Sequence, residues 1–114
     1  MAGFLVKNNV STKVLLFADM EDSSSYSVNA TANLNAFWST LDSFGYKNHG
    51  VYTSNSYLYR DAVVKTVGQS RVWRAQYPYT PSANNLWNTN DGAWQFSDTA
   101  LLPSGSDYTG YIDV

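Results

Sequence analysis

The longest apolar run of the chain, Val14 to Ala18, leads directly into the acidic segment Asp19-Met20-Glu21-Asp22. A short aliphatic run without polar alternation is typical of a parallel strand that is covered on both faces. Residues 2–9, in contrast, have the character of the last turns of a helix, with Asn8-Asn9 as the stop and no N-cap signal before them. The pattern therefore predicts a helix end followed by a buried strand at 14–18.

The clearest helix follows Asn29, which is a suitable N-cap residue. Apolar residues then recur at spacings of three and four, as expected for one face of a helix, and Gly45 follows where such a helix would end. These apolar positions are Ala30, Leu34, Phe37, Trp38, Leu41 and Phe44.

The middle of the chain repeats the order of strand and helix. Residues 50–53 predict a short strand, and Asn55 or Ser56 could cap a helix from about residue 57 to 67 that stops at Gly68. After Gly68 the periodicity changes, and three strand-like stretches at 71–77, 92–97 and 110–114 are separated by loops. The result is a single α/β domain over 1–114.

The loop at 78–91 is long for a connection without regular structure. Long ordered loops in compact domains are more often functional than incidental. We therefore expect this loop to contribute to function.

Composition and charge exclude several classes of protein. Seven basic residues against nine acidic ones give a formal charge of −2, without the basic face that nucleic-acid binding requires. The chain has no cysteine and a single histidine, His49, so the pattern suggests no metal site and no cofactor. No stretch resembles a signal peptide or is long enough to span a membrane.

Aromatic residues are abundant, with 4 Trp, 9 Tyr and 5 Phe making up 16% of the chain. Aromatic surfaces beside neutral hydrogen-bonding groups suit a sugar, whose ring has an apolar C–H face and hydroxyl edges. The alternative explanation is that the tyrosines pack with their hydroxyls in water and bind nothing.

Two acidic residues at the end of the first strand give the most specific chemical signal. Side chains alternate along a strand, so Leu15, Phe17, Asp19 and Glu21 share one face, whereas Asp22 is out of phase and faces the loop. Carboxyl ends of parallel strands are where α/β folds place their binding sites.

A carboxyl group beside a second one is driven toward its protonated form and can then act as an acid. Such a pair serves glycoside hydrolysis. At a spacing of about 6.6 Å between Cα atoms, Asp19 and Glu21 fit neither the retaining nor the inverting class uniquely. The alternative is that this segment is a solvated strand end or a helix-capping turn.

Five segments together resemble the glycoside hydrolase family 25 lysozymes, the muramidases of phage endolysins and bacterial autolysins. They occur in the family's order and run over nearly the whole chain. The segments are LLFADMED, GVYTS, VWRAQY, GAWQFS and GYIDV.

The resemblance implies a partial, irregular TIM-like β/α barrel whose N-terminal strands are missing, so that 1–114 is the C-terminal portion of the catalytic domain. It implies that Glu21 is the general acid, and that Asp19 stabilises positive charge or orients the acetamido group of the substrate. The positions it assigns to the barrel mouth are Tyr52, Trp73, Tyr77, Trp94, Gln95 and Asp113. Trp73 and Trp94 could equally fill the barrel interior.

The implied activity is hydrolysis of the β-1,4 bond between N-acetylmuramic acid and N-acetylglucosamine in bacterial peptidoglycan, outside the cell or in its wall. Two alternatives remain: a non-catalytic module that binds wall glycans, and a fragment that complements a separate amino-terminal piece. Because a barrel without some strands exposes unpaired edges, we also expect one of three arrangements: a complementing fragment as partner, a homodimer, or an open sheet whose edges are protected in another way.

Overall fold

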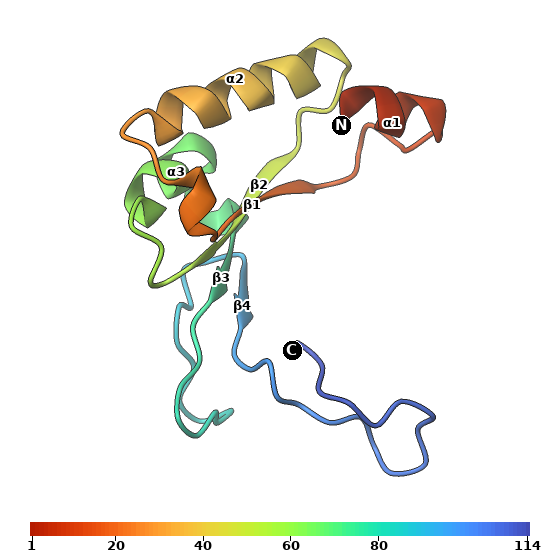
Figure 1. Cartoon of the computed structure of the whole chain (residues 1–114), viewed down its shortest axis with the longest axis vertical. Helices are drawn as coiled ribbons and strands as arrows, with labels where there is room; N and C mark the ends of the chain where they lie inside the picture. The colour runs from red at the N-terminus through yellow and green to blue at the C-terminus, as the bar shows by residue number, and fades with distance from the viewer.

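The computed structural model describes all residues, 1–114, as three α-helices packed on a small parallel sheet (Figure 1). In chain order the elements are α1 (Ala2–Lys7), β1 (Leu16–Met20), η1 (Ser23–Ser25), α2 (Ala30–Ser43), β2 (His49–Ser54), α3 (Arg60–Val67), η2 (Gln69–Arg71), β3 (Val72–Ala75) and β4 (Ala93–Gln95). No helix reaches the length and hydrophobicity that crossing a membrane requires.

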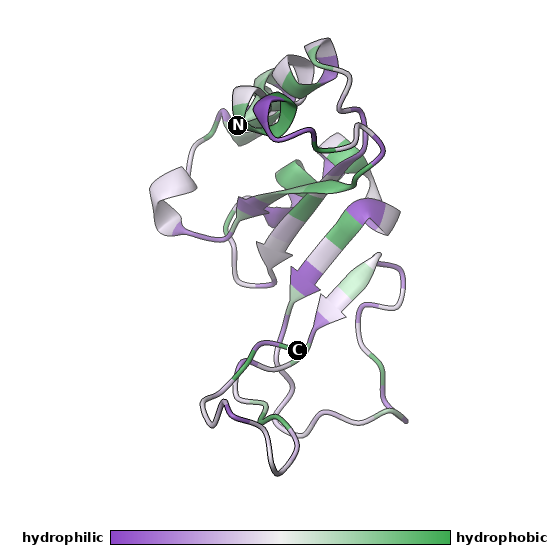
Figure 2. Cartoon of the chain, turned by 90° about the vertical axis from the view of Figure 1, so that its right-hand side faces the viewer, coloured by the Kyte–Doolittle hydropathy of each residue, from purple (hydrophilic) through white to green (hydrophobic).

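The four strands are all parallel and lie in the order β1-β2-β3-β4. Helix α2 connects β1 to β2 and α3 connects β2 to β3, whereas a loop without a helix connects β3 to β4. The loops after β3 and β4 therefore extend away from the helices, as Figures 1 and 2 both show.

The hydrophobic core lies between the helices and one face of the sheet. Leu34, Trp38 and Leu41 recur on one face of α2 and are buried against a cluster that includes Val51 of β2 and Val63 of α3. The Trp38 indole donates a hydrogen bond of 3.2 Å to the Thr66 hydroxyl and so joins α2 to α3. Burial of this apolar face is the main stabilising term for the helices.

His49 belongs to this structural side of the sheet. Its ring stacks on Trp38 with centroids 4.4 Å apart, and its Nε2 lies 2.9 Å from a carboxylate oxygen of Asp42. The histidine thus connects β2 to α2 through contacts with two residues of that helix.

Most predicted elements are confirmed, with shifts at their ends. The helix from Ala30 ends as predicted before Gly45, which has a φ of 89°. The first strand begins two residues later than predicted, at Leu16, and α3 begins at Arg60 instead of near residue 57. Consecutive turns occupy the residues before Arg60, because Tyr57 is buried and its hydroxyl binds Ser25 at 2.9 Å.

The prediction that the first strand is covered on both faces is wrong. Leu15 and Phe17 are 41% and 38% exposed, and Trp73 beside them is 39% exposed. The helices pack on the side of Leu16, Ala18 and Met20, so the opposite face of the sheet stays open.

The predicted last strand at 110–114 is also wrong. This segment forms one isolated antiparallel bridge, between Ala100 and Ile112. The Val114 carbonyl also accepts from the backbone N–H groups of Phe96 and Ser97, and the Val114 N–H donates to the Ser97 carbonyl. Ile112 and Val114 share one side of this segment, but Ile112 is only half-buried and Val114 is 37% exposed, so little apolar burial supports a strand here. The sheet is therefore open, with β1 and β4 at its edges, and does not close into a barrel.

The loop from β3 to β4 is anchored by a buried ion pair. The Arg74 Nε donates a hydrogen bond of 2.6 Å to Asp91, whose side chain is 0% exposed and also accepts from Gln69. The next residue, Gly92, donates its backbone N–H to the Val72 carbonyl at 2.8 Å. These contacts bring the loop back so that β4 can pair with β3.

Gly92 should be intolerant of any side chain. A Cβ at this position would lie 2.4 Å from the backbone oxygen of Ser70, which cannot move without disturbing η2. We expect Gly92→Ala to lower the free energy of unfolding by about 1–3 kcal/mol, measured by urea denaturation. The control Gly3→Ala adds a Cβ with nothing within 4 Å, and equal loss of stability in both variants would contradict the close approach.

Candidate active site

The open face of the sheet carries a hollow at the carboxyl ends of the strands. The strand register places Asp19 of β1 beside Tyr52 of β2, and Tyr52 beside Trp73 of β3. Because alternate residues share a face, Glu21 emerges on the same side, one residue beyond the end of β1. The hollow has a volume of about 390 Å³ and is lined by Phe17, Asp19, Glu21, Tyr52, Trp73, Gln95 and Asp113.

The protonation of Glu21 is shifted by its surroundings. Partial burial, followed by the negative charge of Asp19, raises the pKa of the Glu21 carboxyl, and the nearby polar hydroxyl of Tyr52 opposes the shift. The charges of Asp113 and Asp22 raise this pKa further. A carboxyl group whose pKa is raised keeps its proton at higher pH and can act as a general acid.

Two tyrosines and a glutamine form a hydrogen-bonded chain across the open face. The Tyr52 hydroxyl donates to Gln95 Oε1 at 2.6 Å, and Gln95 Nε2 donates to the Tyr77 hydroxyl at 3.0 Å. Gln95 is only 3% exposed, so both ends of its amide need these partners. Burial raises the pKa of both tyrosines further above neutral pH, so their hydroxyls act as hydrogen-bonding groups without charge.

Aromatic rings form the apolar wall of the hollow. Trp73 makes edge-to-face contacts with Phe17 at 5.7 Å and with Tyr52 at 5.2 Å between ring centroids. Gly50 permits this arrangement, because a Cβ there would lie 2.7 Å from the Phe17 ring. The wall thus combines an apolar surface with carboxylates and an amide, the lining that a sugar ring requires.

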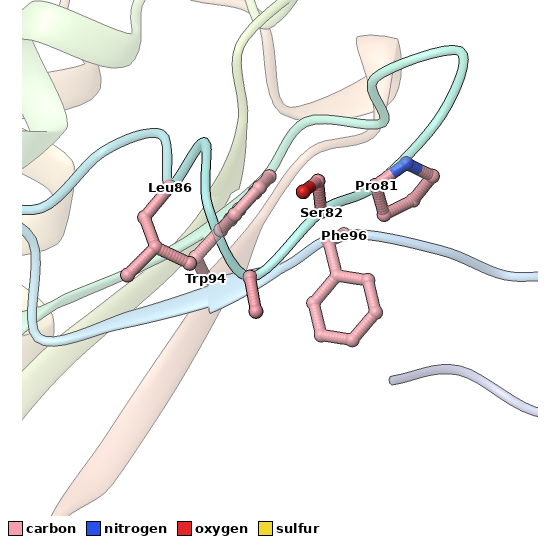
Figure 3. Close-up of a pocket in the computed structure, with 6 residues that line it drawn as sticks. Pro81, Ser82, Leu86, Trp94 and Phe96 are labelled. Carbon is pink, nitrogen blue, oxygen red and sulfur yellow. The ribbon is translucent and has the colours of Figure 1, made fainter.

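Six of the residues predicted for the site line this hollow. Tyr77 is not part of the lining, but its hydroxyl accepts a hydrogen bond from Gln95, which is. Trp94 does not line this hollow either. Its indole donates to the Gln76 carbonyl at 2.7 Å and stacks near Trp87, in a separate apolar hollow of about 350 Å³ beside Leu86 and Phe96 (Figure 3). Neighbouring strand residues point to opposite faces, so Trp94 and Gln95 could not share one.

Several residues near Glu21 were missed by the sequence reasoning. A second hollow adjoins Glu21 and is lined by polar residues at the ends of β2 and β3 or directly after them. The missed residues are Ser54, Asn55, Ser56 and Gln76, and they lie beside Ala75 and the predicted Tyr77. The sequence could have indicated these residues, because polar residues at the carboxyl ends of two parallel strands are candidates for a binding site.

Asp22, in contrast, faces away from the site as predicted. It caps η1 by accepting the Ser24 backbone N–H at 2.7 Å, which lowers the pKa of its carboxyl. No group of three or more His, Cys, Asp or Glu side chains is arranged to hold a metal ion.

The coupling between the two carboxyl groups can be measured directly. We expect Asp19→Asn to lower the pKa of Glu21, because it removes a neighbouring negative charge that favours the protonated form. The pKa is followed by ¹³C NMR titration of the Glu21 carboxyl carbon. An unchanged or higher pKa in the variant would contradict the proximity of the two groups.

One comparison with known proteins identifies a family. The family model described as glycosyl hydrolases family 25 matches residues 3–104, which include every residue of both hollows except Asp113. Neither a comparison with curated proteins nor one with solved structures finds a match. Since the family model covers all but the first two and last ten residues, the chain belongs to glycosyl hydrolases family 25.

Proposed function

We propose that this chain is a lysozyme-type enzyme that hydrolyses the β-1,4 bond between N-acetylmuramic acid and N-acetylglucosamine in bacterial peptidoglycan. The observation that carries the proposal is the pairing of Glu21, whose pKa is raised, with Asp19 in one hollow of a family 25 chain. The action takes place at the cell wall, outside the membrane, and the glycan strand is the partner.

In the proposed reaction, Glu21 donates its proton to the glycosidic oxygen as the bond from that oxygen to the anomeric carbon breaks. Asp19 remains an anion and stabilises the positive charge that develops at the anomeric carbon. It could alternatively orient the acetamido group of the sugar, whose oxygen then attacks that carbon. A water molecule completes the hydrolysis, and its proton restores Glu21.

The residues that line the hollow each have a role in binding the sugar. Trp73 and Phe17 offer an apolar surface to the sugar ring, while Tyr52, Gln95 and Asp113 offer polar groups to its hydroxyls. The chain of hydrogen bonds from Tyr52 to Tyr77 fixes the position of the Tyr52 hydroxyl beside Glu21. Such fixed positions matter because orientation contributes as much to the rate as the acid itself.

Glu21→Gln tests the catalytic assignment. Without a proton to donate, lysis of purified cell walls should fall by about 10²–10⁴-fold, while sedimentation with the walls stays as in the wild type. Asp61→Asn is the control, because the Asp61 side chain is 86% exposed on α3 and is not among the charges that act on Glu21, so lysis should stay unchanged. Equal activity of Glu21→Gln and the wild type would refute Glu21 as the acid.

The second candidate is a wall-binding module without catalysis. It is favoured by the exposure of Trp73, which is 39% exposed on the open face and available to stack on a glycan. A wild-type chain that binds walls and lyses none would support this candidate.

We further propose that 1–114 is the C-terminal portion of a family 25 barrel, completed by strands added at the free edge of β1. The support is that β1 has one neighbour and that Phe17 lies on an uncovered face, whereas parallel sheets are normally covered on both faces. The added strands come from a complementing fragment or from a second copy of the chain.

Mixing this chain with the strands that complete the barrel should therefore increase its lysis of cell walls. We expect the isolated chain to lyse walls weakly, and a separately prepared amino-terminal part of a family 25 domain to raise the rate on mixing. If a second copy of the chain pairs with the free edge of β1 instead, light scattering should show a homodimer. Full lysozyme-like turnover by the monomeric chain would contradict the proposed completion.

A further inference from the structure

Side-chain hydroxyl groups hold the backbone on both sides of Glu21. Before it, the Thr53 hydroxyl of β2 donates a hydrogen bond of 2.8 Å to the carbonyl of Met20, the last residue of β1. After it, the Ser25 hydroxyl donates one of 2.7 Å to the carbonyl of Asp22. Glu21 itself lies beyond the end of β1, where the pairing with β2 has stopped. The two hydrogen bonds therefore hold the chain directly before and after a residue that the sheet does not fix.

The hydroxyl of Ser25 is itself held by a buried tyrosine. The Tyr57 hydroxyl lies 2.9 Å from the Ser25 hydroxyl and donates to the Ser25 carbonyl at 3.3 Å. Tyr57 is 0% exposed, and its ring packs edge to face on Tyr26 with centroids 5.2 Å apart. Tyr57 thus connects η1, and with it the chain after Glu21, to the residues that follow β2.

Thr53 acts from the face of the sheet that carries the helices. It is 0% exposed and lines neither of the hollows beside Glu21. Strand alternation places it on the same side as Val51 of the core, whereas its neighbour Tyr52 lines the hollow on the open face. Thr53 therefore cannot touch a glycan in that hollow, and any effect on catalysis has to pass through the backbone of Met20 and Glu21.

Packing alone does not require a hydroxyl at position 53. Val51 and its partner Val72 on β3 fill neighbouring buried positions with apolar side chains, and valine has the same branched shape as threonine. Burial of a hydroxyl group costs free energy unless the group is hydrogen-bonded. What distinguishes Thr53 from a valine at this position is therefore its hydrogen bond to Met20.

We propose that Thr53 and Tyr57 are positioning residues for Glu21. The Thr53 hydroxyl fixes the end of β1 and Tyr57 fixes the turn that follows, so that the Glu21 carboxyl is held in the hollow beside Asp19. The proposal rests on the proposed hydrolysis for the role of Glu21 as the acid. The position of the Glu21 carboxyl, in contrast, can be followed whether or not the chain lyses walls.

The protonation of Glu21 depends on its position. Its raised pKa comes first from burial and then from the charge of Asp19, while Tyr52 opposes the shift and the charges of Asp113 and Asp22 add to it. A Glu21 side chain that is no longer held gains contact with water and can move away from Asp19. Both changes favour the charged carboxylate, so the pKa falls.

Thr53→Val tests the positioning, because it removes the hydroxyl and keeps the branched side chain. We expect the pKa of Glu21, followed by ¹³C NMR titration of its carboxyl carbon, to fall toward the ordinary glutamate value. Thr53→Ser, which keeps a hydroxyl, should hold the pKa near that of the wild type. Thr66→Val is the matched control, because it removes a hydroxyl that binds the Trp38 indole between α2 and α3 and should leave the Glu21 titration unchanged.

The pH profile of glycan cleavage gives the catalytic readout. The acid must carry its proton, so cleavage declines as the pH rises through the pKa of Glu21. In Thr53→Val this decline should move to lower pH, and kcat should fall about 10–10²-fold with KM unchanged, because the walls that bind the sugar stay in place. A purely structural defect would lower the melting temperature without moving the pH profile. Tyr57→Phe should act in the same direction, and it replaces Thr53→Val if that variant does not fold.

The outcomes for the two proposals differ. If Thr53→Val and Tyr57→Phe both leave the titration of Glu21 as in the wild type, or if Thr66→Val changes it equally, the positioning is wrong while the hydrolase stands. If the wild type cleaves no glycan, the hydrolase is wrong for the isolated chain, and the NMR titration alone decides on the positioning.

Discussion

The hydrogen bond from Tyr52 to the buried amide of Gln95 ties β2 to β4 across the open face, and the candidate site depends on it. It passes over β3, where the register places the small side chain of Ala75 beside Gln95. A larger residue at this position would obstruct the contact. Because the bond spans a strand, the hollow has its shape only when all four strands are paired.

The two faces of the sheet divide structure from chemistry. Even-numbered residues of β1 pack on the helices with Val51 and Val63, whereas Phe17, Asp19 and then Glu21 face the opposite side. A strand that ended in polar residues on its buried face would lose core area, so the acids can occur only on the open face or beyond the strand end. The acidic end of the first strand is explained by this division.

The sequence predicted the parts of the fold that depend on local periodicity. The apolar spacing of three and four defines α2, and alternation in β1 places Asp19 and Glu21 on one side. Pairing between distant residues has no local signal, so the sequence could not reveal the Arg74–Asp91 ion pair or the orientation of Gln76 by Asn88. The error over Trp94 is different, since alternation with Gln95 already placed it on the other face.

The same distinction explains the open sheet. A resemblance to a barrel-forming family predicts strands, but residues 110–114 form only an isolated bridge and a few hydrogen bonds to residues 96–97. Their apolar side chains, Ile112 and Val114, are not fully buried. The β1 edge remains unpaired, with Phe17 beside it on the open face.

The central claim is that Glu21 protonates the glycosidic oxygen of a glycan that lies over the hollow of Asp19 and Trp73. The most direct measurement is a crystal structure of the Glu21→Gln variant with a bound N-acetylated oligosaccharide. The account predicts a glycosidic oxygen about 2.6–3.2 Å from the side chain at position 21, with a sugar against Trp73. A glycan lying in the apolar hollow beside Trp94, or away from position 21, would contradict it.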